Sequence, residues 1–262
     1  MNPVPFEDID IELCGLITLI GQSNSGKTTL LRSIINKLID KGLFKTYVFS
    51  STANIYRHTD YDFSLPCNVR TINMDSIERI INMQEQLIIR SGTDKRLDPK
   101  WICIVLDDFI GATNSNLAKK GAEIISRLAV SGRHYKTCLI LLTQHLNKAP
   151  PVVRLQSAYV FVTKTNMSTV KESLFQMQTK FTNKHQLWDV YKNHTSKKKY
   201  SSLMIQTLDP YEENVHLLEP AKIVQFIKDN DSTDILAEND YLNELKDKKT
   251  DNGDTGDDQS SL

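Results

Sequence analysis

The chain has 262 residues, of which 40% are apolar and 24% charged, and its formal net charge is zero. This length suits one large α/β domain or two small ones, and the composition is that of a globular protein rather than a fibrous or disordered one. No stretch approaches the roughly 18 apolar residues of a membrane-spanning helix, and no secretory signal is visible at the start. We expect a soluble, intracellular protein.

Charge is unevenly distributed along the chain. Residues 231–262 contain ten acidic residues and three lysines, so residues 1–230 carry a net charge of +7. A mildly basic body is compatible with a nucleic-acid partner but does not require one. The acidic segment has almost no apolar periodicity, and we expect it to be disordered.

The four cysteines form no CxxC pair. Cys14, Cys103 and Cys138 lie in apolar runs, and Cys67 follows a proline. This spacing indicates neither a zinc site nor a disulfide framework, so we expect buried free thiols.

Apolar, β-rich runs alternate with segments of helical periodicity. The sequence predicts strands over 13–20, 46–50, 69–73, 101–106, 137–143 and 158–163, and helices over 27–41, 75–90 and 116–130. Gly42 is expected to end the first helix, and the spacing of Asp75 and Glu78 predicts a capping box for the second. This alternation predicts an α/β fold of three layers, with a mostly parallel central sheet between helices.

After residue 165 the pattern changes. The sequence predicts two short helices within 168–193, a basic turn and a strand within 197–208, and a last helix from Pro220. We therefore predict a core over 1–165, a small α+β extension over 166–230 packed on it, and a disordered acidic tail over 231–262.

Residues 21–28 read GQSNSGKT and match the phosphate-loop motif G-x-x-x-x-G-K-[ST], between a predicted strand and a predicted helix. Small residues let successive backbone N–H groups wrap a polyphosphate, and the helix start adds its positive dipole end. We expect Lys27 to contact the β- and γ-phosphates and Thr28 to ligate Mg²⁺. The residues expected to contact the nucleotide are Gly21, Gln22, Ser23, Asn24, Ser25, Gly26, Lys27, Thr28 and Thr29. The alternative is a Gly/Ser turn before an ordinary helix.

Two acidic residues end the apolar run WICIVLDDF, residues 101–109. We expect Asp107, at the strand end beside the phosphate loop, to hold Mg²⁺ through water. Asp108 is expected to polarise the attacking water, although hydrolytic NTPases commonly place Glu there. The alternative is a pair of acids that begins a solvent loop.

The apolar run over 137–143 ends in Thr143 and Gln144. An amide that faces the γ-phosphate can orient water and report hydrolysis, which is the role we expect for Gln144. A glutamine that merely starts the next loop is the alternative.

Arg133 follows a glycine at the end of a predicted helix, so a loop presents its guanidinium. There it can reach a neighbouring subunit's γ-phosphate as an arginine finger. Arg127 and Arg154 are rivals for this role, and an ordinary surface arginine is the alternative.

Taken together, four segments resemble the HerA/FtsK superfamily of P-loop ATPases, and more narrowly the poxvirus-type genome-packaging ATPases of large DNA viruses and virophages. The segments are GQSNSGKT (21–28), ICIVLDDF (102–109), SGRHYKTCLILLTQ (131–144) and APPVVRLQSAYVFV (149–162). The most discriminating element is GRH before an apolar strand that ends in Gln. The resemblance covers roughly residues 10–165.

The resemblance implies a RecA/FtsK-like fold and a ring-forming motor that hydrolyses ATP with Mg²⁺ to move double-stranded DNA into a preformed capsid. It carries over Asp107 on Mg²⁺, Gln144 as sensor and Arg133 acting in trans. The implied partners are DNA bound without sequence specificity, further copies in a pentamer or hexamer, and a viral capsid or portal-vertex protein. The implied location is the host cytoplasm or a viral factory, or the virion.

The resemblance does not identify residues that grip DNA. From the residues themselves we nominate 114–121 and 145–154 as basic loops at the strand ends. There Lys119, Lys120 and Lys148 would neutralise backbone phosphates. Solvated lysines are the alternative for each, as for the basic run 196–200.

Three other functions share parts of this pattern. A small-molecule kinase would need an arginine-rich lid, whereas the Asp-Asp strand end favours hydrolysis. A regulatory GTPase is disfavoured because Asn183-Lys184 is followed by His185-Gln186, without the Asp of a guanine-reading motif. A DNA-associated ATPase of plasmid partition or secretion shares all of this chemistry.

Overall fold

The computed structural model describes residues 1–56, 59–65, 68–108, 115–146, 149–165, 168–177, 180–207, 214–222 and 226. The predicted acidic tail and most of the predicted helix from Pro220 lie outside these residues. Residues Met1–Val224 form one compact unit. In the part of the chain that is described, no helix is long and apolar enough to cross a membrane.

One eight-stranded sheet organises this unit, with the strand order β3-β2-β4-β5-β1-β6-β7-β8. The six strands from β3 to β6 run parallel, and β7 and β8 add an antiparallel edge. The strands are β1 Leu16–Ile20, β2 Leu43–Ser50, β3 Val69–Arg70, β4 Trp101–Asp107, β5 Thr137–Thr143, β6 Tyr159–Val162, β7 Ser202–Gln206 and β8 Val215–Leu218. The predicted mostly parallel sheet is thereby confirmed.

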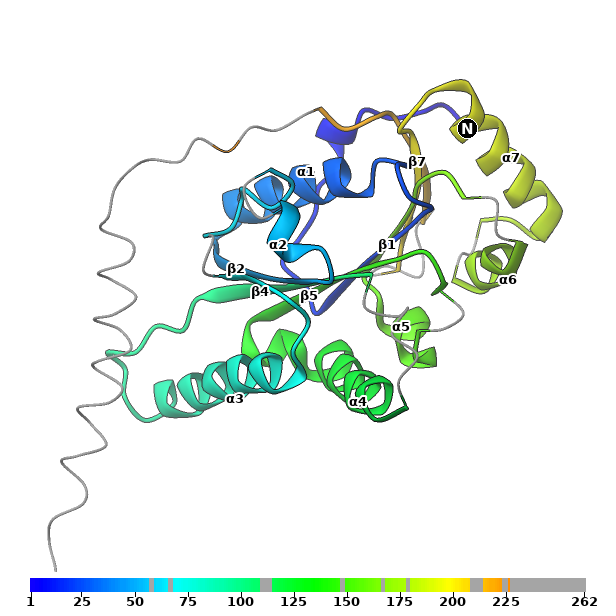
Figure 1. Cartoon of the computed structure of the whole chain (residues 1–262). Helices are drawn as coiled ribbons and strands as arrows, with labels where there is room; N and C mark the ends of the chain where they lie inside the picture. Colours follow the sequence, from blue (N-terminus) through cyan, green and yellow to red (C-terminus); the bar gives the residue numbers. More distant parts are fainter. Residues whose placement is uncertain are drawn as a thin grey trace, which may run out of the picture. The chain divides into compact units, whose positions relative to one another are not determined.

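Helices cover both faces of the sheet (Figure 1). In that view α1 and α2 lie above the sheet, α3, α4 and α5 lie below it, and α6 and α7 lie beside the end that carries β7. The helices are α1 Lys27–Asp40, α2 Ala53–Tyr56, α3 Met74–Ser91, α4 Ser115–Ser131, α5 Pro151–Gln156, α6 Ser168–Met177 and α7 Lys184–Lys197, with 3₁₀ turns η1 Phe6–Asp8 and η4 Gly132–Tyr135. Coverage on both faces explains why β1 and β5 are buried along their whole length.

Most of the predicted elements are present with shifted ends. Strand β5 has the predicted bounds, and Gly42 follows α1 with a positive φ of 97°, a conformation that glycine adopts without steric cost. The strand predicted over 69–73 is shorter, and β8 was not predicted. Cys14, Cys103 and Cys138 are buried free thiols as expected, whereas Cys67 lies outside the described residues.

The predicted capping box at the start of α3 is wrong. Asn73 caps this helix, and its Oδ1 accepts a hydrogen bond from the Ser76 backbone N–H at 2.9 Å. Instead, the Lys120 ammonium of α4 donates a hydrogen bond to Asp75 and forms an ion pair with Glu78. An Asn two residues upstream offers the same capping oxygen, so the helix begins one residue earlier than predicted.

Candidate functional site

The phosphate loop joins β1 to α1 at the carboxyl edge of the sheet. Asn24 and Gly26 have positive φ values of 58° and 94°, which curl the backbone ahead of Lys27, the first residue of α1. From Gly26 to Thr29, no backbone N–H donates to a described residue. Unpaired donors at a helix start form a site for an anion. The loop therefore fits a polyphosphate.

Close packing beneath the loop explains its first glycine. A Cβ on Gly21 would lie 1.9 Å from Thr163 Oγ1 and 2.6 Å from Ser25 Oγ. These two hydroxyls are 2.6 Å apart in a buried hydrogen bond, so the end of β6 supports the loop. Helix α7 fixes that end in turn, because Tyr191 donates its hydroxyl to the Thr163 carbonyl at 2.7 Å. Thr163 and Tyr191 were missed in the sequence because neither belongs to a motif.

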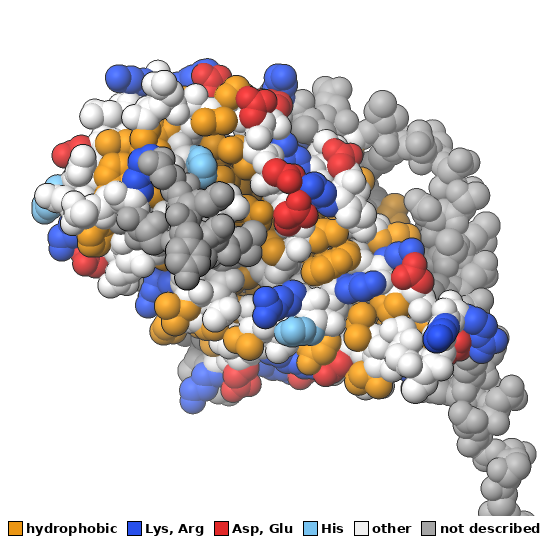
Figure 2. Space-filling view, turned by 180° about the vertical axis from the view of Figure 1, so that it is seen from behind, with side chains coloured by type: hydrophobic (Ala, Val, Ile, Leu, Met, Phe, Trp, Pro, Cys, Tyr) orange, Lys and Arg blue, Asp and Glu red, His pale blue; other side chains and the backbone are white. Residues whose placement is uncertain are grey.

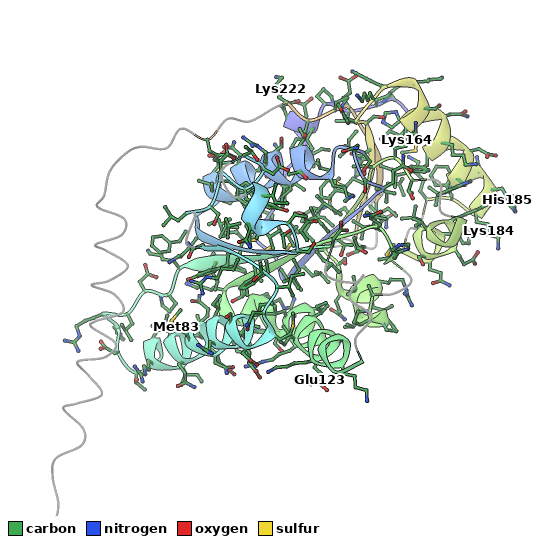
Figure 3. The ribbon with its side chains drawn as sticks, in the orientation of Figure 1. Met83, Glu123, Lys164, Lys184, His185 and Lys222 are labelled. Carbon is green, nitrogen blue, oxygen red and sulfur yellow. The ribbon has the colours of Figure 1, made fainter. Side chains whose placement is uncertain are left out.

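A backbone hydrogen bond also ties the loop to the segment after β6, since Gln22 donates its N–H to the carbonyl of Lys164 at 3.1 Å. Lys164 lies on the same side of the molecule as α1 and the loop (Figure 3). In the same view Lys184 and His185, at the start of α7, point away from the sheet.

Lys27 is buried and folds back on its own loop. Its Nζ donates to the carbonyls of Gly21 at 2.8 Å and Gln22 at 3.0 Å. Burial lowers the pKa of Lys27, and the negative charges of Asp108 and Asp107 oppose this shift. The ammonium therefore lies inside the loop and within the electrostatic reach of both acids.

The two acids lie at the same edge as the loop because β5 connects β4 to β1. Asp107 pairs with Leu142 of β5, and Thr143 of β5 pairs with Ile20 of β1. The next N–H groups continue this ladder, with Asp108 donating to the Leu142 carbonyl and Gly21 to the Thr143 carbonyl, both at 3.2 Å. A strand inserted between the loop strand and the acidic strand matches the fold expected from the resemblance.

Asp107 is held by a tyrosine that sequence reasoning missed. The hydroxyl of Tyr61 donates to Asp107 Oδ2, and Tyr61 is only 2% exposed. Burial raises the pKa of Asp107, whereas the Tyr61 hydrogen bond opposes that rise. The carboxylate is thus oriented from one side, and no described residue hydrogen-bonds its Oδ1.

Asp108 and Gln144 face each other across the ends of β4 and β5. Gln144 Nε2 lies 3.3 Å from Asp108 Oδ2 and 3.5 Å from Oδ1. Asp108 has a positive φ of 51°, which Asp tolerates better than bulkier residues. Because Asp107, Asp108 and Gln144 lie beside the loop, the structure brings together all of the predicted residues except Arg133.

Arg133 lies at the opposite edge of the sheet. It belongs to η4, and its backbone nitrogen lies 3.7 Å from where a Cβ on Gly15 would be, just before β1 begins. The five residues of β1 span about 16 Å, so this exposed arginine cannot reach the loop of its own chain. Arg127, one rival, pairs with Glu85 and donates to Asn82 at 3.1 Å.

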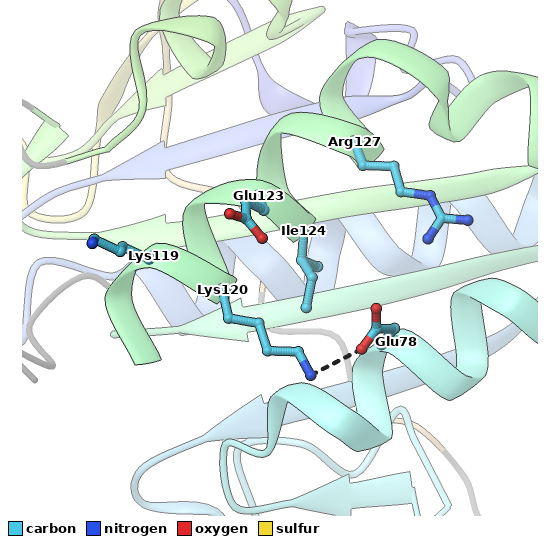
Figure 4. A pocket seen from close by; sticks show the side chains of 6 residues that line it. All are labelled: Glu78, Lys119, Lys120, Glu123, Ile124 and Arg127. Atoms are coloured by element: carbon cyan, nitrogen blue, oxygen red, sulfur yellow. Dashed lines mark ion pairs between the residues drawn. The ribbon is translucent and has the colours of Figure 1, made fainter. Parts of the chain in front are cut away.

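The first segment nominated for DNA binding is not a loop. Residues 115–121 begin α4, and Lys120 is engaged with two acids of α3 (Figure 4). In the same view Lys119 points away from that pair. In this structure partly exposed ion pairs engage the Lys120 ammonium, and its expected role in neutralising DNA phosphates stays a prediction. Lys148 lies outside the described residues, and α5 begins at Pro151 inside the second nominated segment.

A shallow depression of about 450 Å³ lies between α3 and α4. It is lined by Glu78, Lys119, Lys120, Glu123, Ile124 and Arg127. Its mixed charges do not define a ligand. Figure 2 shows the side of the molecule opposite to Figure 1, where basic and acidic side chains are interspersed among hydrophobic ones. No basic patch dominates the described part of this face.

The expected Mg²⁺ ligands, Thr28 and Asp107, fit a hard cation by their chemistry. A hydroxyl and a half-buried carboxylate are oxygen donors of the kind that Mg²⁺ takes in nucleotide sites. Among the described residues, no group of three or more His, Cys, Asp or Glu side chains is placed to hold a metal ion, so nothing there suggests a cage built from protein alone. Thr28 and Asp107 therefore suit a cation whose other ligands include phosphate oxygens of the nucleotide.

Comparison with known proteins agrees with this geometry. No curated protein matches the chain in sequence. The fold is similar to that of the genome packaging NTPase B204 from Sulfolobus turreted icosahedral virus 2 in complex with sulfate, with 14% identity and a TM-score of 0.54 over 82% of this chain and 100% of that one. It is also similar to ATPases 2 and 3 of EssC from Geobacillus thermodenitrificans, with 15% identity and a TM-score of 0.52 over 89% of this chain and 44% of that one.

Identities this low establish the fold alone, whereas a family model establishes membership. The model of the family described as "Poxvirus A32 protein" matches residues 15–239, which include the phosphate loop, both acids, Gln144 and Arg133. The chain therefore belongs to the poxvirus A32 protein family, and it is an ATPase of viral genome packaging.

Proposed function

We propose that this ATPase moves double-stranded DNA into a preformed capsid as a homo-oligomeric ring, a pentamer or hexamer, with a capsid or portal-vertex protein as its docking partner. The observation that carries the proposal is the separation of Arg133 from the other site residues. The loop, the acids and Gln144 lie at the carboxyl edge of the sheet, whereas Arg133 is exposed at the amino edge. A head-to-tail contact between copies brings these two edges together, and such contacts close into rings.

Each residue near the loop has a role that its position supports. The N–H groups from Gly26 to Thr29 would donate to phosphate oxygens, and Lys27 would turn from the loop carbonyls to the terminal phosphate. Thr28 and Asp107 would hold Mg²⁺, which offsets phosphate charge when bound. Asp107 keeps its orientation through Tyr61.

Asp108 and Gln144 would act on the attacking water. Their side chains converge, with Gln144 Nε2 3.3 Å from Asp108 Oδ2, so a water held beside this pair would donate to the Asp108 carboxylate and accept from the Gln144 amide. Asp108 would take the proton as the water attacks. Arg133 of a neighbouring copy would then stabilise the charge that develops on the phosphate.

Phosphate release by the purified chain with Mg²⁺, measured with and without linear duplex DNA at low salt, tests the translocase proposal. We expect duplex DNA to stimulate turnover, and we expect the stimulated enzyme to displace a triplex-forming oligonucleotide from the duplex. Added salt should weaken stimulation because non-specific binding depends on phosphate contacts. Turnover that ignores duplex DNA at low salt contradicts the proposal.

A further inference from the structure

Tyr200 has an unusual backbone conformation in a tight turn between α7 and β7. Ser201 donates its N–H to the Lys198 carbonyl at 3.3 Å and its hydroxyl to the same carbonyl at 2.8 Å. Lys198 also pairs with Glu219 at 3.0 Å, which anchors the turn. Tyr200 has a φ of 68° there, a left-handed conformation that is an outlier for a bulky side chain. A turn that glycine would suit better thus carries a tyrosine.

The ring of Tyr200 lies against the phosphate loop. A Cβ on Gly26 would lie 2.9 Å from Tyr200 Cδ1 and 3.2 Å from its Cβ. Tyr200 is nevertheless 45% exposed as a residue, and the ammonium of Lys199 lies 4.7 Å from the centroid of its ring. A cation over the ring shows that this aromatic surface is open to another group.

The sheet order places Tyr200 on one particular side of the loop. Strand β1 has β5 and then β4 on one flank, which carry Gln144, Asp107 and Asp108. On the other flank β7 runs antiparallel to β6, with Val162 paired to Leu203, so the residues just before β7 lie at the carboxyl edge. Tyr200 and the acids therefore lie on opposite flanks of the loop.

A nucleoside triphosphate that fits this site has a fixed direction. Its terminal phosphate must approach the acids and the amide, so the nucleoside extends from the loop towards the flank of β6 and β7. Aromatic side chains bind bases by stacking, because every base has a π-face. We propose that Tyr200 forms one wall of the nucleobase subsite and stacks on the base of the bound nucleotide, in place of Lys199. This inference rests on the proposed binding of ATP at the loop.

Inorganic tripolyphosphate provides the test because it has the phosphates of ATP but no base. Binding of ATP and of tripolyphosphate, each with Mg²⁺, is measured by calorimetry for the wild type, Tyr200→Ala and Tyr200→Phe. We expect Tyr200→Ala to weaken ATP binding about tenfold or more and to leave tripolyphosphate binding unchanged. Tyr200→Phe keeps the ring and should bind both ligands like the wild type.

Phe44→Ala is the matched control, since Phe44 is an exposed aromatic residue, 71% accessible, at the start of β2 and away from the loop. Equal losses for ATP and tripolyphosphate in Tyr200→Ala would overturn the inference, because the ring would then only support the loop. An unchanged ATP affinity would overturn it as well. A wild type that binds neither ligand overturns the proposed function itself. If the wild type binds both ligands, either of the two contrary results above overturns only the inference about Tyr200.

Tyr200→Trp adds a direct readout of stacking. A purine stacked on the indole should quench its fluorescence when ATP binds, and tripolyphosphate should not. Quenching by both ligands alike contradicts base contact at this position.

Discussion

Tyr61 donates a hydrogen bond of 2.5 Å to Oδ2 of Asp107, across 46 residues of sequence. Its hydroxyl also lies 3.1 Å from Ser50 Oγ, at the end of the strand next to β4. Burial and the neighbouring Asp107 charge raise the pKa of Tyr61, so this hydroxyl remains a donor. The proposed metal-binding carboxylate is thereby oriented by a residue outside all of the sequence motifs.

Tyr61→Phe should impair the use of Mg²⁺ without unfolding the protein. Phe fills the same volume, but Asp107 loses a hydrogen bond to a charged group, which contributes about 1.5–3 kcal/mol. We expect turnover to fall about tenfold or more, and half-maximal activity to need more Mg²⁺. The measurement is a Mg²⁺ titration of ATP turnover and of nucleotide affinity.

Tyr159→Phe is the control for this change. It also removes a buried hydroxyl, but that hydroxyl accepts from the Glu12 N–H, before β1 and away from the loop. Wild-type Mg²⁺ dependence in Tyr61→Phe would show that the hydroxyl does not orient Asp107.

Most of the fold was predictable because its signals are local. Continuous apolar runs identified β4 and β5, and the spacing of glycine, lysine and threonine identified the loop between β1 and α1. The supports of the site were not predictable in this way. Tyr61, Thr163 and Tyr200 reach the site from distant segments, and a lone tyrosine or threonine has no periodicity or spacing that marks such a contact.

Local signals also failed where two residues competed for one task. Asn73 caps α3 although Asp75 and Glu78 have capping-box spacing, and only the ion pairs with Lys120 show where those acids go. The sequence also shows no sign that Lys120 is paired, because its acidic partners lie 42 and 45 residues away on another helix. The roles assigned to the site residues themselves stay predictions.

Lys27→Ala should abolish ATP turnover. Its ammonium is the only side-chain cation that any described contact places inside the loop, and removing a charge-stabilising donor costs about 10²–10³ in rate. Phosphate release measures the loss, and circular dichroism checks the fold. Lys37→Ala, on the same helix but bonded to the Glu7 carbonyl, should keep wild-type turnover. A Lys27→Ala enzyme within tenfold of wild type would contradict the assignment.

Gly21→Ala should weaken nucleotide binding by distorting the loop. The added methyl would lie 1.9 Å from Thr163 Oγ1, so either the end of β6 or the loop must move. Overpacking of this kind costs about 1–3 kcal/mol, and we expect a loss of about tenfold or more in ATP affinity. Fluorescent-nucleotide binding measures it.

Gly15→Ala is the matched control at the other end of the same strand. A Cβ there meets its nearest neighbour, the Ala129 carbonyl oxygen, at 3.7 Å, which is ordinary contact. We expect wild-type affinity from this variant. If Gly21→Ala binds ATP as tightly as Gly15→Ala and the wild type, the contact with Thr163 does not restrict the residue at position 21, and the prediction is wrong.

Arg133→Ala subunits should be inactive alone and regain activity when mixed with Lys27→Ala subunits. In a mixed ring, a Lys27→Ala copy still presents its Arg133 to the intact loop of its neighbour, and an arginine finger contributes about 10³–10⁵ in rate. Random 1:1 mixing of head-to-tail copies should restore about one quarter of the sites. Phosphate release after subunit exchange measures the recovery.

Arg127→Ala is the comparison variant. Because Arg127 is already paired with Glu85 in its own chain, we expect the Arg127→Ala enzyme to be active without mixing. If Arg127→Ala is the inactive variant and mixing rescues it, Arg127 rather than Arg133 acts in trans. If mixed Arg133→Ala and Lys27→Ala subunits stay inactive although they assemble together, Arg133 does not reach from the amino edge of one copy to the loop of the next. The position of Arg133 at the amino edge would then have no role in hydrolysis, and copies in the ring would have to contact each other through other surfaces.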